Sequence, residues 1–163
     1  MSYPDVRKKI TKAFIDKINK LYLKPDVIAG CATAGIPHAA WIASELDLPM
    51  VYVRSKPKGH GKGNQIEGKI ERGEKVVVIE DLISTGGSSL ETARVLQEEG
   101  LEVLAVIAIF TYGLEISEQR FKEADIPFDT ITRFDYLLDV LIESKEITEN
   151  DKLRLLTWRD QLS

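Results

Sequence analysis

Two adjacent carboxylates, Glu80 and Asp81, are separated by two residues from a cluster of hydroxyl groups and glycines. The cluster consists of Ser84, Thr85, Gly86, Gly87 and Ser88. Glycine allows positive φ and close approach of the backbone to a ligand, while Ser and Thr supply hydroxyls and can cap the helix expected to follow. The N-terminus of a helix has free N–H groups that bind anions, phosphate above all. These residue types in this order therefore predict a phosphate-binding turn beside two acids.

A glycine-rich turn is a weak motif, because the same residues also suit a plain connection with a helix cap. The two carboxylates favour a functional interpretation. Acids beside a phosphate would repel it unless they contact the hydroxyls of the same ligand or a metal ion. We therefore predict a phosphorylated sugar as the ligand. A P-loop is excluded because no lysine follows Gly86 and Gly87.

The element that positions the acids is the run Val76 to Ile79, four consecutive β-branched residues. Such a run is typical of a strand buried on both faces of a parallel sheet. Open sheets of this kind bind ligands beyond the carboxyl ends of their strands, which is where the two acids fall. We expect the carboxylates to face a ligand at that edge.

Strand and helix patterns alternate along the rest of the chain. Strands are predicted at 27–30, 50–53, 76–79, 103–110 and 128–131, with a short strand or hairpin arm at 67–70. Helices are predicted at 5–22, 34–46, 90–99, 115–124, 135–143 and 149–159. This alternation predicts an α/β fold with a doubly wound, mainly parallel sheet flanked by helices. At 163 residues we expect a single domain, 1–163.

Two further loops follow predicted strands. The first, Ala32, Thr33, Ala34 and Gly35, has almost no side chains, and from the residues alone it predicts only a tight strand-to-helix connection. The second, residues 54–66, combines four basic residues, His60, glycines and Pro57. Lysine-rich surface loops are usually only solvated, but one with Lys58 and His60 among glycines is a candidate lid over a highly charged ligand. We expect this loop to be mobile.

Three stretches resemble a known family. Residues 76–89 are similar to the phosphoribosyl pyrophosphate (PRPP) motif of the type I phosphoribosyltransferases. Residues 26–40 and 52–68 resemble the orotate phosphoribosyltransferases of the bacterial kind, and the resemblance extends from about Tyr3 to Trp158. It implies that the chain transfers the phosphoribosyl group of PRPP to orotate, with Mg²⁺, giving orotidine 5′-monophosphate and pyrophosphate.

The resemblance also implies roles for single residues. It makes Asp81, Lys58 and His60 catalytic, Ala32 to Gly35 the pyrophosphate loop, and Ser84 an orotate contact. Ser55 stands where some members have a catalytic lysine, and Lys56 is one place along. The residues implied to bind PRPP are Arg54, Lys58, His60, Glu80, Asp81, Leu82, Ile83, Ser84, Thr85, Gly86, Gly87 and Ser88. The family further implies a homodimer in which the 54–66 loop is shared between subunits.

Composition restricts the other function classes. The net charge of −4 argues against a nucleic-acid binder, which normally has a basic excess. No apolar run approaches membrane-spanning length, and the start at Met1 lacks the pattern of a signal peptide, so we expect a cytoplasmic protein. Cys31 is the only cysteine, and we interpret it as a small buried or loop thiol rather than a nucleophile.

Two alternatives remain open at this stage. Another base phosphoribosyltransferase would share the PRPP motif, although the loop at 54–68 argues against a purine enzyme. A PRPP-binding regulator or remnant without turnover is the second. Family members usually have an additional N-terminal segment of a few dozen residues that covers the base, whereas this chain begins inside the first core helix. We expect PRPP recognition to be more complete than orotate recognition.

Overall fold

The computed structural model describes residues 2–56 and 65–162 of the chain. Helices and strands alternate along most of it, except that β3 and β4 follow β2 and that α6 follows α5. The strands are β1 (Val27–Cys31), β2 (Met50–Val53), β3 (Ile66–Glu67), β4 (Lys75–Ile83), β5 (Glu102–Thr111) and β6 (Phe128–Arg133). The helices are α1 (Pro4–Lys20), α2 (Gly35–Leu46), α3 (Gly87–Glu98), α4 (Glu115–Glu123), α5 (Phe134–Glu143) and α6 (Glu149–Asp160).

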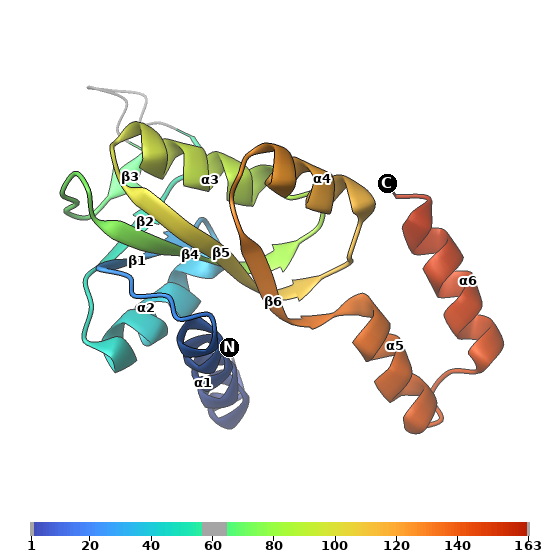
Figure 1. Cartoon of the computed structure of the whole chain (residues 1–163). Helices are drawn as coiled ribbons and strands as arrows, with labels where there is room; N and C mark the ends of the chain where they lie inside the picture. Colours follow the sequence, from blue (N-terminus) through green and yellow to red (C-terminus); the bar gives the residue numbers. More distant parts are fainter. Residues whose placement is uncertain (1, 57–64, 163) are drawn as a thin grey trace.

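Within the described residues, the six strands form one sheet in the order β3-β2-β1-β4-β5-β6 (Figure 1). Neighbouring strands are parallel except β2 and β3, which are antiparallel. In the central strand β4, Val76 to Ile79 are 0% exposed, so both faces of the sheet are covered. The prediction of a doubly wound, mainly parallel α/β fold is confirmed.

Each face of the sheet packs against its own pair of helices (Figure 1). Phe14 of α1 and Ile42 of α2 pack with Val77 of β4 in one cluster of buried residues. On the opposite face, Leu96 of α3 and Phe121 of α4 pack with a second cluster. Because side chains of a strand alternate between faces, β4 contributes to both clusters and holds the two layers together.

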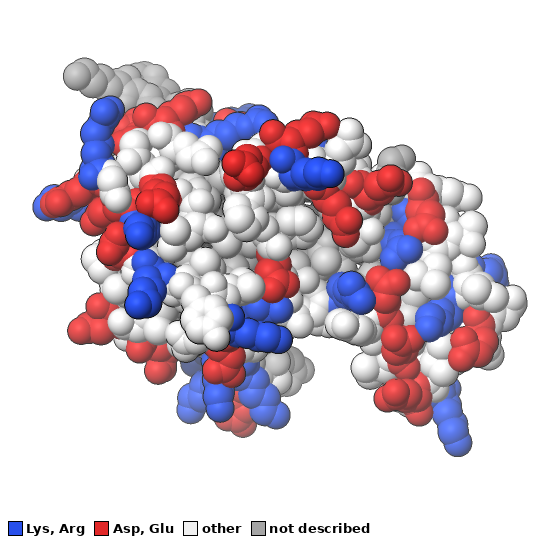
Figure 2. Space-filling view, in the orientation of Figure 1, with Lys and Arg blue, Asp and Glu red and all other residues white. Residues whose placement is uncertain are grey.

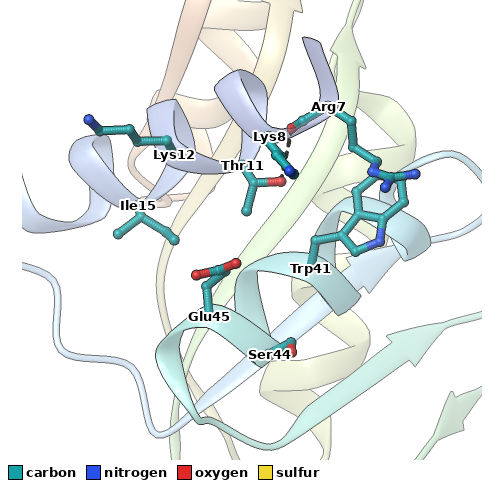
Figure 3. A pocket seen from close by; sticks show the side chains of 8 residues that line it. All are labelled: Arg7, Lys8, Thr11, Lys12, Ile15, Trp41, Ser44 and Glu45. Atoms are coloured by element: carbon teal, nitrogen blue, oxygen red, sulfur yellow. Dashed lines mark hydrogen bonds between the residues drawn. The ribbon is translucent and has the colours of Figure 1, made fainter. Parts of the chain in front are cut away.

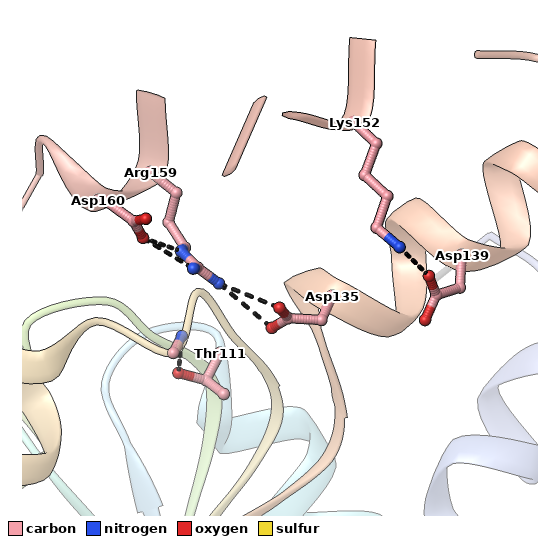
Figure 4. A network of polar contacts seen from close by, with 7 residues as sticks. Thr111, Asp135, Asp139, Lys152, Arg159 and Asp160 are labelled. Atoms are coloured by element: carbon pink, nitrogen blue, oxygen red, sulfur yellow. Dashed lines mark hydrogen bonds and ion pairs between the residues drawn. The ribbon is translucent and has the colours of Figure 1, made fainter. Parts of the chain in front are cut away.

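Helices α5 and α6 form a hairpin beside the sheet (Figure 1). Thr148 and Asp151 form a capping box at the start of α6. The Arg159 guanidinium donates to the Asp135 carboxylate of α5 at 3.2 Å, and Lys152 forms a second ion pair between the helices (Figure 4). No residue of α6 is fully buried within the described chain. Several large apolar side chains of this hairpin are exposed: Tyr136 at 55%, Val140 at 58% and Leu153 at 63%.

Several boundaries differ from the prediction, including the start of α3 at Gly87 rather than residue 90. The first helix ends at Lys20 rather than Tyr22, because Tyr22 has φ +54°, which a right-handed helix cannot contain. The arm predicted at 67–70 is a strand only at Ile66–Glu67. The central strand continues beyond Ile79 to Ile83. The acidic pair therefore lies inside the strand, near its C-terminal end, rather than after the strand.

Charged side chains of both signs are interspersed over the face shown in Figure 2. Within residues 2–56 and 65–162, no helix combines the length and the hydrophobicity that crossing a lipid bilayer requires. The predicted mobile segment falls mainly on residues 57–64, which lie outside the described residues.

Candidate active site

One open cavity of about 470 Å³ lies at the carboxyl ends of β1 and β4. Three separate segments meet there: the loop after β1, the end of β4 and the turn into α3. Its lining residues are Ala32, Thr33, Ala34, Glu80, Asp81, Leu82, Ser84, Thr85, Gly86, Gly87 and Ser88. The fold therefore brings two of the loops singled out from the sequence together with the acidic pair.

Glu80 and Asp81 project to opposite sides of the sheet because they are consecutive residues of a strand. Glu80 turns toward α3, where the hydroxyls of Ser88 and Ser89 each lie 3.4 Å from its Oε2. Asp81 is half-buried and lies on the side of α2, where its charge acts on His38. The cavity thus has one carboxylate on each side of the end of β4.

Glu80 is only 4% exposed. Burial raises the pKa of its carboxyl to about 7, and a hydrogen bond with the Cys31 side chain opposes this rise. The backbone N–H of Asp81 donates to Glu80 Oε1 at 3.0 Å. Near neutral pH this carboxyl therefore exchanges readily between its neutral and charged forms in the ligand-free protein.

The turn at 84–88 leaves its N–H groups available for an anion. Gly86 is the N-cap of α3 with φ +79°, a conformation that favours glycine, and no side chain caps the helix. Two of the hydroxyls expected to cap the helix, those of Ser88 and Ser89, instead donate to the Glu80 carboxylate. Among the described residues, no side chain therefore caps the first N–H groups of α3 at the wall of the cavity.

Leu82 and Ile83 lie differently from each other. Leu82 lines the cavity and is 37% exposed. Ile83 is 0% exposed and packs in the core cluster below α3 and α4. Of the two residues implied to bind PRPP here, Ile83 has no side-chain surface that faces the cavity.

The loop Ala32 to Gly35 forms the opposite wall. Its peptide bond between Ala32 and Thr33 is cis, and the N–H of Ala32 donates to Val53 O at 3.1 Å. Helix α2 begins at Gly35 with Ala34 as N-cap and no side-chain cap. A second helix N-terminus, lined by small side chains, therefore faces the same cavity.

Arg54 and Cys31 line a smaller adjoining cavity of about 160 Å³, which shares Ala32 and Ser88 with the first. Arg54 Nη1 lies 3.3 Å from Glu67 Oε1, so its guanidinium is paired across the β2–β3 edge. Lys58 and His60 lie outside the described residues. The structure brings Arg54 to the rim of the site but not into the main cavity.

Cys31 is 2% exposed, and its Sγ lies 3.1 Å from Thr92 Oγ1. Burial, followed by the nearby Glu80 carboxyl, raises the pKa of the thiol to about 12. A thiol that holds its proton so strongly is not a nucleophile at neutral pH. The interpretation of Cys31 as a buried thiol is confirmed.

A different cavity, of about 420 Å³, lies between α1 and α2 and shares no residue with the acidic site. There the Arg7 guanidinium lies 4.8 Å from the centre of the Trp41 ring, and Glu45 projects between the helices (Figure 3). The His38 ring packs edge-on against the Trp41 ring, with 5.4 Å between ring centres, and the residue is 7% exposed. Its Nδ1 has no hydrogen-bond partner among the described residues. Burial lowers its pKa, so this imidazole is neutral at neutral pH.

One of the contacts that sequence reasoning missed comes from α4. Arg120, on α4, donates from Nη1 to the carbonyl oxygen of Thr85 at 3.1 Å. These residues are 35 positions apart, and neither periodicity nor a motif links them. This contact between Arg120 and Thr85 exists because α4 packs beside the turn at 84–88.

Comparison with known proteins places this site in context. The chain matches the phosphoribosyl transferase domain over residues 2–147. It is 60% identical to the orotate phosphoribosyltransferase of Oceanobacillus iheyensis over 99% of this chain and 80% of that protein. The enzyme of the same name from Fusobacterium nucleatum is 58% identical over 99% of this chain and 77% of its own length.

Solved structures similar to this chain include an orotate phosphoribosyltransferase and a UMP synthase. The orotate phosphoribosyltransferase of Aeropyrum pernix superposes with a TM-score of 0.77 at 26% identity, covering 85% of this chain and 77% of that one. A UMP synthase from Leishmania donovani superposes with a TM-score of 0.82 at 25% identity, covering 98% of this chain and 34% of that one.

Proposed function

The chain belongs to the phosphoribosyltransferase family, among the orotate phosphoribosyltransferases, and from this membership we propose that it transfers the phosphoribosyl group of PRPP to orotate. The products are orotidine 5′-monophosphate and pyrophosphate. The observation that supports this most strongly is that one cavity has a carboxylate pair between two helix N-termini, neither of which has a side-chain cap among the described residues. PRPP likewise has an anionic group at each end of a sugar with free hydroxyls.

The two ends of the ligand suit different loops. The backbone and hydroxyls of Ser84 to Ser88 hold the 5′-phosphate at the N-terminus of α3. The loop Ala32 to Gly35 holds the pyrophosphate, which needs backbone N–H groups and little side-chain bulk. Arg54 at the rim, with Lys58 and His60 of the loop at 54–66, neutralises the departing charge. In this arrangement Arg54 exchanges its partner Glu67 for the leaving group.

Glu80 and Asp81 hold the ribose hydroxyls between these two ends. In the reaction, the lone pair of an orotate ring nitrogen forms a bond to ribose C1 while the bond from C1 to the pyrophosphate oxygen breaks. The electron pair of the broken bond stays on pyrophosphate. The proton that the attacking ring nitrogen carried in orotate is released to solvent. Positive charge that develops on the sugar is stabilised by the carboxylates, above all Asp81.

Mg²⁺ enters this proposal as part of the substrate. Among the described residues, no group of three or more His, Cys, Asp and Glu side chains is arranged to hold a metal ion. The acidic pair and the hydroxyls of the turn at 84–88 are oxygen donors of the kind that Mg²⁺ accepts. We propose that the ion arrives on the PRPP oxygens and that these groups lie next to it.

Three further expectations belong to the same proposal. Ser84, which lines the cavity, contacts orotate. The protein acts in the cytoplasm. It works as a homodimer that shares the loop at 54–66, and the exposed apolar side chains of α5 and α6, such as Val140 and Leu153, offer surface for such an interface.

The test is a product assay. The purified chain is incubated with PRPP, Mg²⁺ and either orotate, adenine, hypoxanthine or xanthine, and nucleotide products are separated by chromatography. Formation of orotidine 5′-monophosphate, with no purine nucleotide, supports the proposal. A purine nucleotide as the main product would assign the other base class, and binding of PRPP without any product would indicate a binding protein.

A further inference from the structure

Helix α4 lies directly behind the turn that forms the anion-binding wall. At Gly86 an added Cβ would lie 2.9 Å from Cε2 of Phe121, so this ring is in close contact with the turn. Phe121 is itself 1% exposed and stacked on Phe128 at 4.4 Å between ring centres. The turn therefore rests on a rigid aromatic surface rather than on solvent.

Arg120, the residue before Phe121, adds a polar contact from the same helix. Its Nη1 donates to the carbonyl oxygen of Thr85 at 3.1 Å. Arg120 also lines a cavity of about 530 Å³ between α3 and α4. This cavity and the acidic cavity have only Gly87 in common among their lining residues.

The orientation of one peptide group follows from this contact. Among the described residues the cis peptide bond is at Ala32–Thr33, so the bond between Thr85 and Gly86 is trans. In a trans peptide the C=O and N–H groups point in opposite directions. A Thr85 carbonyl held by α4 therefore turns the Gly86 N–H away from that helix, and Thr85 and Gly86 both line the acidic cavity.

Without a partner this peptide plane would be easy to rotate. Gly86, at φ +79°, has no side chain that restricts its backbone, and the turn has no side-chain cap that fixes it. Rotation would exchange an N–H donor for a carbonyl oxygen at the anion site, which would repel phosphate.

We propose that Arg120 is a positioning residue for the 5′-phosphate, because its bond to the Thr85 carbonyl keeps the Gly86 N–H directed at the phosphate. This inference rests on the proposed function for the identity of the anion. Arg120 acts through the backbone of the turn and does not itself touch the ligand.

The test separates the two ends of PRPP with partial ligands. Ribose 5-phosphate probes the turn at 84–88, and inorganic pyrophosphate probes the loop at 32–35. Arg120→Ala is expected to weaken ribose 5-phosphate binding about tenfold, leave pyrophosphate binding unchanged, and raise the KM for PRPP with kcat within about twofold. Arg120→Gln, which keeps an N–H donor without the charge, is expected to restore part of the affinity.

Arg94→Ala is the matched control, because Arg94 lines the same α3–α4 cavity and, in the described part of the chain, donates no hydrogen bond to the turn. It should leave both affinities unchanged. Three results would overturn the proposal: equal weakening of both partial ligands by Arg120→Ala, full rescue by Arg120→Lys with none by Arg120→Gln, or unchanged ribose 5-phosphate binding. Calorimetric binding needs no turnover, so a chain that makes no nucleotide would refute the proposed function and still test Arg120.

Discussion

Gly35 lies against the backbone carbonyl of Ile79, so closely that an added Cβ would be 2.3 Å from the oxygen. This contact joins the loop proposed for pyrophosphate to the strand that contains the acidic pair. Because α2 begins at Gly35, the same contact sets how near that helix N-terminus comes to Glu80. The distance between the proposed pyrophosphate loop and the acidic pair therefore depends on the absence of a side chain at Gly35.

Gly35→Ala is expected to destabilise the fold by about 3 kcal/mol, because backbone on both sides would have to move. Urea unfolding measures this. Gly87→Ala is the control, since an added Cβ there would have Thr85 Oγ1 at 4.0 Å as its nearest neighbour. Its free energy of unfolding should stay within about 1 kcal/mol of the wild type. Equal stability of the two variants would contradict the role given to the Gly35 contact.

Glu80 should make the stability of the ligand-free protein depend on pH. Its folded pKa, about 7, is above the ordinary value of 4.5, so the folded state binds the proton more tightly. The stabilisation is complete below about pH 4.5 and is lost as the pH rises through 7, by about 3 kcal/mol in total. Glu80→Gln should remove this loss.

The measurement is a series of unfolding curves from pH 4.5 to 8.5 for the wild type and Glu80→Gln. The lowered pKa of His38 acts in the opposite direction, because its neutral form is favoured in the folded state. Cys31, with a pKa of about 12, stays neutral throughout. The difference between the two proteins isolates Glu80, and parallel curves would show that burial does not hold the proton on this carboxyl.

The sequence predicted the elements and their order well, because apolar periodicity depends on local pattern. The buried run Val76 to Ile79 and the alternation around it were sufficient for the fold class. Boundaries failed where one residue changed the backbone, as at Tyr22 with φ +54°. The length of β4 was underestimated because Glu80 and Asp81 are unusual in a strand, and pairing with β5 keeps them there.

The sequence predicted which segments form the site, but not how their side chains contact one another. The segments 32–35 and 80–88 were identified, and all of their residues except Gly35 and Ile83 line one cavity. Sequence pattern does not show that the serine hydroxyls point to Glu80, that Arg54 pairs with Glu67, or that Arg120 reaches Thr85. Each of these contacts depends on how separate elements pack together, and the contact of Arg120 with Thr85 joins residues 35 positions apart.

Asp81→Asn should keep the fold and lower kcat by about a hundredfold or more if this carboxylate stabilises positive charge on the sugar. The substitution removes charge with little change of size at a half-buried position. Asp47→Asn is the matched control, since Asp47 ends α2 in a left-handed conformation that Asn tolerates and does not line the cavity. A thermal melt of both variants separates loss of chemistry from loss of stability, and near-normal turnover of Asp81→Asn would remove it from the mechanism.

The loop at 54–66 allows the shared-site proposal to be tested by mixing two inactive variants. Lys58→Ala removes a loop group and Asp81→Asn removes a cavity group, so each homodimer should be nearly inactive. If the loop of one subunit serves the cavity of the other, a heterodimer has one site with both defects and one site with neither. An isolated heterodimer, purified with two different affinity tags, should then recover about half of the wild-type activity.

If each loop instead serves its own cavity, both sites of the heterodimer are defective and mixing recovers nothing. Two differently tagged wild-type chains carried through the same exchange and purification give the reference activity. Sedimentation of the wild type at assay concentration completes the test, because an active monomer would exclude a site shared between subunits.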